Sequence, residues 1–159
     1  MPRPLYIICS ASGALDSYTN AISLFGIIEY LRFREAEPQA DGAVVAPPLS
    51  MRVVATWIKE KEDSLTDKFE AQLAVFIEGI EKEIMTTDFP LFSFEVPVHR
   101  LVLPELSFPS NLDIPDGLLR FQCRLRRAGE KEWRWHQEYA IQTEQLPVEK
   151  TAIQSIPPK

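Results

Sequence analysis

Histidines and cysteines are the residues of this chain best suited to act as nucleophiles, bases or metal ligands. They number only four: His99, His136, Cys9 and Cys123. Side chains of a strand point alternately to opposite faces, and this alternation places His136 on a polar face and Cys123 on an apolar one. Zinc needs several Cys or His ligands at short spacing, and these four are widely separated. We therefore expect no catalytic residues and no metal ligands among them.

Two pairs of aspartates are the next candidates, because clustered carboxylates bind calcium. Asp63 and Asp67 form one pair, and Asp113 and Asp116 form the other. Each pair lies among turn-forming residues, where aspartate commonly hydrogen-bonds to the backbone. Turn and cap roles explain the pairs without a metal. A small-ligand or calcium-dependent binding domain of the C2-like type remains an alternative.

Motifs for cofactor and nucleophile chemistry are missing from the sequence. It contains no Gly-x-Ser-x-Gly elbow, no glycine-rich phosphate loop and no dinucleotide fingerprint. We expect no cofactor and a non-enzymatic interaction or structural module. An enzyme with an unrecognised site is a further alternative.

A basic surface near the end of the chain is the one candidate docking face. Arg120, Arg124, Arg134 and His136 share the polar side of two alternating runs, although the net charge of the chain is −6. Such a face suits an acidic protein partner or a polyanion. The alternative is a solvated sheet face whose charges discourage edge pairing.

The runs that carry these residues predict a β-hairpin. "LLRFQCRLRR" and "WRWHQEYAIQ" alternate apolar and polar residues, and Gly129 lies in the turn between them. We expect strands near 118–126 and 132–142. Pairing centred on Gly129 places Trp133 and Trp135 in a hydrophobic core.

Other short runs predict a protein built of strands. A strand at 21–33 is expected to bend at Gly26, and the segment 64–84 fits either a helix or a strand, which we assign as a strand over 68–77. The remaining expected strands cover 5–9, 50–60, 89–98 and 100–106.

Length and composition are those of one globular domain. The chain has 159 residues, of which 45% are hydrophobic, and its 13 prolines favour short elements. We expect a domain over 1–145 with a mobile insertion near 34–49, followed by a tail over 146–159. The negative net charge argues against a specific nucleic-acid partner. Two reduced thiols and no membrane-length apolar run predict a cytoplasmic protein.

The order of the motifs "NAISLFGIIEYLRF", "MRVVATWIKE", "FEAQLAVFIEG" and "LDIPDGLLRFQCRLRRAGEKEW" resembles a family of small uncharacterised bacterial β-sandwich proteins. The resemblance covers roughly residues 5–142. It implies an all-β, immunoglobulin-like sandwich and supports the strand at 68–77, but it implies no activity and no site residues. A protein partner or self-association is the role that we expect of such a module. A C2-like sandwich, or an α+β fold if 64–84 is helical, is the alternative.

Overall fold

The computed structural model describes residues 2–15, 21–34, 50–80, 83–108 and 114–146. This part of the chain contains nine strands and no helix. The strands are β1 (Arg3–Leu15), β2 (Ile22–Ile27), β3 (Tyr30–Arg34), β4 (Ser50–Ile58), β5 (Phe69–Ile77), β6 (Glu83–Asp88), β7 (Val98–Ser107), β8 (Gly117–Arg127) and β9 (Trp135–Leu146). The expected all-β class is confirmed.

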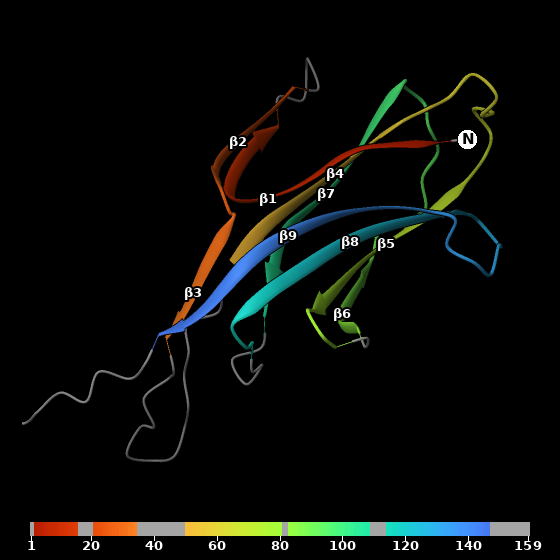
Figure 1. Cartoon of the computed structure of the whole chain (residues 1–159). Coiled ribbons are helices and arrows are strands. Elements are labelled where there is room, and N and C mark those ends of the chain that lie inside the picture. Colours follow the sequence, from red (N-terminus) through yellow and green to blue (C-terminus); the bar gives the residue numbers. More distant parts are fainter. Residues whose placement is uncertain (1, 16–20, 35–49, 81–82, 109–113, 147–159) are drawn as a thin grey trace, which may run out of the picture.

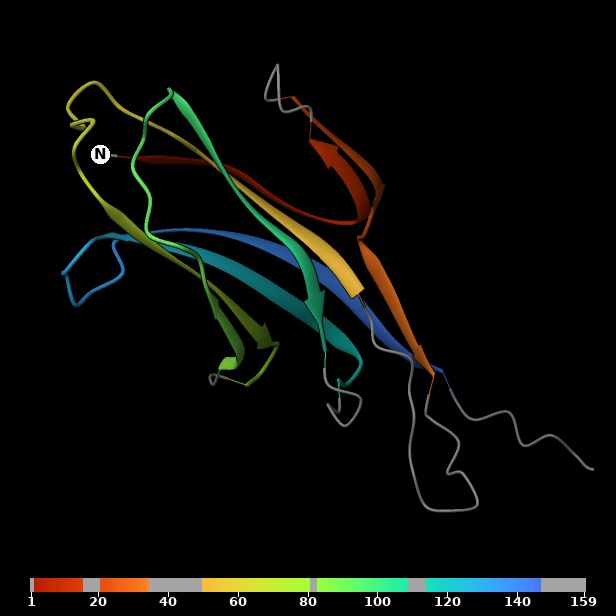
Figure 2. The same cartoon turned by 180° about the vertical axis from the view of Figure 1, so that it is seen from behind.

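The strands form two sheets packed face to face, which makes a β-sandwich (Figures 1 and 2). The first sheet has the order β2-β1-β4-β7, and the second has the order β3-β9-β8-β5-β6. All described pairings are antiparallel except that of β3 with β9, which is parallel. One hydrophobic core lies between the sheets, because both contribute alternate buried residues to it.

The two sheets share an unusual crossover near the start of the chain. The first part of β1, up to Ser10, pairs with β4. The rest of β1 forms a hairpin with β2, and β2 ends where Ile27 pairs with Ser10. The amide of Ile28 then donates a hydrogen bond to the carbonyl of Cys9 at 3.0 Å. From there the chain enters the second sheet as β3. The hairpin is therefore an excursion from the point where the chain passes between the sheets, and Figure 1 shows it at one end of the sandwich.

The single strand expected over 21–33 is instead two strands, β2 and β3, which are separated after Ile27. Gly26, the site of the expected bend, has a φ of 64°, a conformation that favours glycine. The strand expected at 5–9 is longer, and it is not buried on both faces, since Ile7 and Cys9 are buried while Tyr6 and Ile8, which alternate with them, are only half-buried.

The segment 64–84 adopts the strand alternative. β5 occupies Phe69–Ile77, and its alternate residues enter the core, so sheet pairing with β6 and β8 overrides the helical propensity of its Ala and Glu residues. The strand expected at 89–98 is wrong. Pro90 and Pro97 leave only an isolated bridge between Phe92 and Phe69 in that segment, and β6 lies before it.

The β8–β9 hairpin is confirmed, but its register differs by two residues from the one centred on Gly129. Leu125 pairs with Trp135 instead of Trp133, because the connection between the strands is longer than a tight turn. A shift of two residues keeps every side chain on its face. Trp135 therefore packs against the core as expected, whereas Trp133 lies before the start of β9.

The expected mobile insertion near 34–49 and the expected tail over 146–159 fall almost entirely outside the described residues. No helix among the described residues is long and apolar enough to cross a membrane.

Candidate functional site

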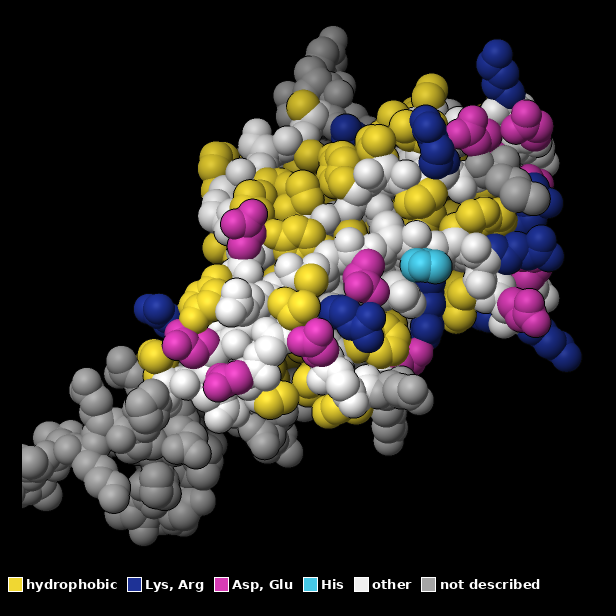
Figure 3. Space-filling view, in the orientation of Figure 1, with side chains coloured by type: hydrophobic (Ala, Val, Ile, Leu, Met, Phe, Trp, Pro, Cys, Tyr) yellow, Lys and Arg dark blue, Asp and Glu magenta, His cyan; other side chains and the backbone are white. Residues whose placement is uncertain are grey.

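The basic face predicted from the sequence exists on the outer side of the second sheet, but its arginines are paired with acids of the same chain. Arg120 lies 3.6 Å from Glu138, and Arg134 lies 2.9 Å from Glu130. Figure 3 shows dark blue and magenta side chains interspersed over much of the surface. His136 is exposed and pairs across the hairpin with Arg124. The sequence therefore located the face, and three of its four residues, Arg120, Arg124 and Arg134, form ion pairs with acids of the same chain.

Arg124 is the most enclosed member of this face. Its guanidinium lies 2.8 Å from Glu83 on β6 and donates from Nε to Gln72 on β5 at 2.9 Å. Only 15% of its side chain is exposed. Arg124 thus joins three adjacent strands of the second sheet, which makes it part of the framework as well as of the surface.

Trp133 corrects the expectation of a second core tryptophan in the hairpin. Its ring lies on the arginine face, with the guanidinium of Arg126 4.2 Å and that of Arg124 5.2 Å from the ring centroid. Arg126 also forms an ion pair with Glu70 at 2.7 Å. The indole therefore forms cation–π contacts with two arginines. Strand alternation could not predict this arrangement, because Trp133 precedes the strand.

The aspartates considered for calcium have structural partners. Asp63 accepts a hydrogen bond from the amide of Glu60 at 2.9 Å, and the guanidinium of Arg127 lies 4.0 Å from Asp63 and 3.4 Å from Asp67. Asp116 accepts a hydrogen bond from the amide of Gln145 at 2.5 Å. Asp113 lies outside the described residues. In the described part of the chain, no three His, Cys, Asp or Glu residues are grouped as metal ligands would be.

Both cysteines are buried and unpaired. Burial raises the pKa of Cys9 and that of Cys123 to about 12, so each thiol stays protonated at neutral pH. A protonated, enclosed thiol is a poor nucleophile. The thiols therefore act as small apolar groups of the core.

The surface that the sequence did not single out is the outer edge of β2. Among the described residues β2 pairs only with β1, so one of its edges has no strand partner. Phe25 is 58% exposed and Ile27 is 47% exposed. Figure 3 shows hydrophobic side chains gathered over the β1–β2 end of the molecule. The signal was present in the sequence as "ISLFGI", a run without a charge.

The other sheet edges differ from β2 in charge. Arg100 and Glu105 lie on β7, Arg32 on β3, and Glu83 and Asp88 on β6. Charges on an edge strand discourage pairing with another chain. β2 is the only one of the nine described strands that has no charged residue. It therefore lacks the protection that the other three edges have.

A side chain of β4 anchors the β1–β2 hairpin to the sandwich. Arg52 on β4 donates a hydrogen bond from Nη1 to the carbonyl of Gly13 on β1. A Cβ at position 13 would lie 2.9 Å from the carbonyl oxygen of Ser23 and 3.0 Å from a methyl group of Leu24. Glycine therefore permits both the close pairing of the hairpin and the approach of Arg52. The exposed edge is presented by an anchored element.

The chain matches no protein-family model, and no curated protein matches it significantly.

Proposed function

We propose that the chain is a non-enzymatic interaction module that associates with a second copy of itself through the edge of β2. The observation that carries this proposal is the combination of a sheet edge with no partner among the described strands, exposed Phe25 and Ile27, and a complete lack of charge on that strand. An unpaired edge offers a row of backbone donors and acceptors to another strand.

The β2 strand of a second copy suits this edge better than any other edge strand of that copy does. Antiparallel pairing of β2 with β2 of another copy satisfies a two-fold axis, in which each copy uses the same surface. It brings no charge against the apolar side chains of either copy. Every other edge would bring charged residues to the interface.

We also propose that the sandwich is immunoglobulin-like. The parallel pairing of β3 with β9, together with the antiparallel pairing of β1 with β4, supports this assignment. In that arrangement the N-terminal strand contributes to both sheets. Here the β1–β2 hairpin is inserted at the point where the chain passes from the first sheet to the second. Immunoglobulin-like sandwiches serve many unrelated functions, so the fold adds no activity to the proposal.

Docking through the arginine face is a second proposal of lower rank. The partners at Arg120, Arg124 and Arg134 leave this face less basic than its sequence indicates. Binding there should weaken as the salt concentration rises. Association through β2 should be insensitive to salt, because β2 has no charge.

Sedimentation equilibrium of wild-type protein and two lysine variants tests the self-association. Ser23→Lys puts a charge on the exposed side of β2 and should raise the dimer dissociation constant by at least about tenfold, or 1.4 kcal/mol. Thr86→Lys is the matched control, since Thr86 is an exposed hydroxyl residue on the β6 edge. A wild-type protein that remains monomeric at high concentration, or equal effects of the two variants, would contradict the proposal.

A further inference from the structure

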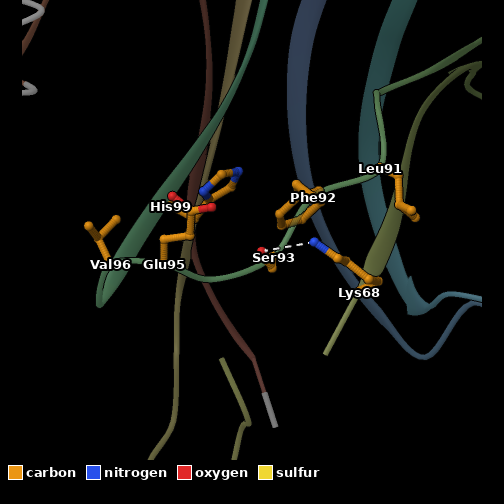
Figure 4. Close-up of a pocket in the computed structure, with 7 residues that line it drawn as sticks. All are labelled: Lys68, Leu91, Phe92, Ser93, Glu95, Val96 and His99. Atoms are coloured by element: carbon orange, nitrogen blue, oxygen red, sulfur yellow. Dashed lines mark hydrogen bonds between the residues drawn. The ribbon is translucent and has the colours of Figure 1, made fainter. Parts of the chain in front are cut away.

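A pocket beside the isolated bridge between Phe69 and Phe92 takes no part in the proposed self-association. Its volume is about 340 Å³, within the range of small-molecule sites. The lining comes from the residue before β5, the segment before β7 and β7 itself, and it consists of Lys68, Leu91, Phe92, Ser93, Glu95, Val96 and His99 (Figure 4).

An aromatic pair forms the rigid wall of this pocket. The rings of Phe92 and His99 are stacked, with their centroids 4.3 Å apart and an interplanar angle of 2°. Phe92 also contacts Phe69 and Phe94, both of which are buried in the core. Two backbone hydrogen bonds between Phe69 and Phe92, of 2.8 and 3.2 Å, fasten the segment to β5. The wall is therefore preformed.

Opposite charges flank the aromatic pair. Figure 4 shows Lys68 entering from one side and Glu95 from the other, with the rings of Phe92 and His99 between them. The Lys68 ammonium has one weak partner among the described residues, the Ser93 hydroxyl at 3.4 Å. Glu95 forms no ion pair within the described part of the chain. Both charged groups are available to a ligand.

The remaining lining is apolar and exposed to solvent. Leu91 is 58% exposed and Val96 is 45% exposed, one beside each charged residue. Burial lowers the pKa of His99, although Glu95 opposes this effect, so the imidazole is neutral at neutral pH. A neutral ring adds to the apolar wall and leaves Lys68 as the only cation among the described residues that line the pocket.

We propose that this pocket binds a small zwitterion that has a carboxylate at one end, an ammonium at the other and an apolar carbon chain between them. The carboxylate contacts Lys68 and Ser93, the ammonium contacts Glu95, and the carbon chain lies along Phe92 and His99. A ligand with a single charge satisfies one end of the pocket and leaves the other without a partner. The inference is independent of association through β2.

Three probes with the same carbon chain test the charge requirement: ε-aminocaproate, caproate and hexylamine. The chain has two histidines, so the ring protons of His99 are readily resolved by NMR, and those of exposed His136 serve as an internal reference. We expect ε-aminocaproate to shift the His99 signals with a dissociation constant on the order of 1 mM. Each singly charged probe should bind about tenfold more weakly, as expected for the loss of one charged hydrogen bond.

Two charge-removing variants locate the contacts. Lys68→Gln and Glu95→Gln should each weaken the binding of ε-aminocaproate about tenfold. Lys61→Gln is the control, because Lys61 is exposed and does not line the pocket. A melting temperature close to that of the wild type reports that the fold of each free variant is intact. No His99 shift with any probe, or equal binding of caproate, hexylamine and ε-aminocaproate, overturns the proposal.

Discussion

At the scale of single residues, the two tryptophans of the β8–β9 hairpin have different roles although they are two positions apart. Trp135 packs against the core and lies 6.5 Å from the ring of Phe69, whereas Trp133 covers Arg126 on the outer face. Large aromatic residues in a core contribute far more to stability than residues that stack on an exposed cation do.

Alanine substitution should separate these two roles. Trp135→Ala should lower the free energy of unfolding by about 3 kcal/mol, the low end for a core aromatic because Trp135 is only partly buried. Trp133→Ala should cost about 1 kcal/mol through the loss of its cation–π contact. Urea denaturation of both variants measures the difference. Equal losses of about 3 kcal/mol for the two variants would contradict this pairing and favour the register centred on Gly129, in which both tryptophans lie in the core.

The buried thiols make the protein sensitive to alkaline pH. The pKa of Cys9 is about 12 in the folded protein and the ordinary value is 9.0, so its burial stabilises the fold fully below about pH 9 and this contribution is lost as the pH rises toward 12. Above about pH 9 the free energy of unfolding should fall by about 1.4 kcal/mol per pH unit for each thiol. Denaturation curves at several pH values measure this slope.

Cys9→Ala provides the comparison, because the other titrating groups are present in both proteins, although the raised pKa of Tyr139 owes part of its shift to Cys9. The slope of the variant should be shallower than that of the wild type by the contribution of one thiol. Identical slopes would show that the Cys9 thiol is not shielded in the folded state.

At the scale of elements, Arg124 connects β8 to both β5 and β6. Arg124→Ala should lower the free energy of unfolding by about 2 kcal/mol, since it removes charge-assisted hydrogen bonds from an enclosed position. Arg134→Ala should change it by less than about 0.5 kcal/mol, because the Arg134 side chain is 53% exposed and its ion pair is screened. Thermal denaturation of the two variants compares them. Equal losses would place Arg124 on the solvated surface.

The alternation of apolar and polar residues predicted most strands, because one buried face imposes a period of two on the sequence. It could not predict the two-residue shift at Trp135, since both registers bury the same side of β8. Nor could it predict that 89–98 is not a strand while β6 is one. β6 has the sequence EIMTTD, and it forms because β5 offers a free edge, which is a tertiary effect.

The candidate sites were less accessible to sequence analysis than the strands. Alternation located the arginine face correctly, but the acids that pair with Arg124 and Arg127 come from other strands and loops. The β2 edge is recognisable only when the sheet order is known, because an uncharged run in the middle of a sheet would be unremarkable. The pocket beside His99 depends on a bridge between Phe69 and Phe92, which no local pattern specifies.

At the scale of the whole molecule, three sheet edges carry charges and one does not. In the proposed self-association, this asymmetry confines pairing to a single surface, which the β1–β2 hairpin presents at one end of the sandwich (Figure 1). An interface confined to one edge gives a closed dimer and not an extended fibre, provided that both copies use the same strand.

Amide hydrogen exchange of β2 at two protein concentrations tests this association most directly. In an antiparallel strand, some amides point to the inner neighbour and the others point outward. The β2 amides that point away from β1 should exchange rapidly in dilute protein and slowly in concentrated protein, because a second copy protects them in the proposed dimer. The outward amides of β6 should exchange rapidly at both concentrations. Rapid exchange of the outward β2 amides at both concentrations would contradict the account.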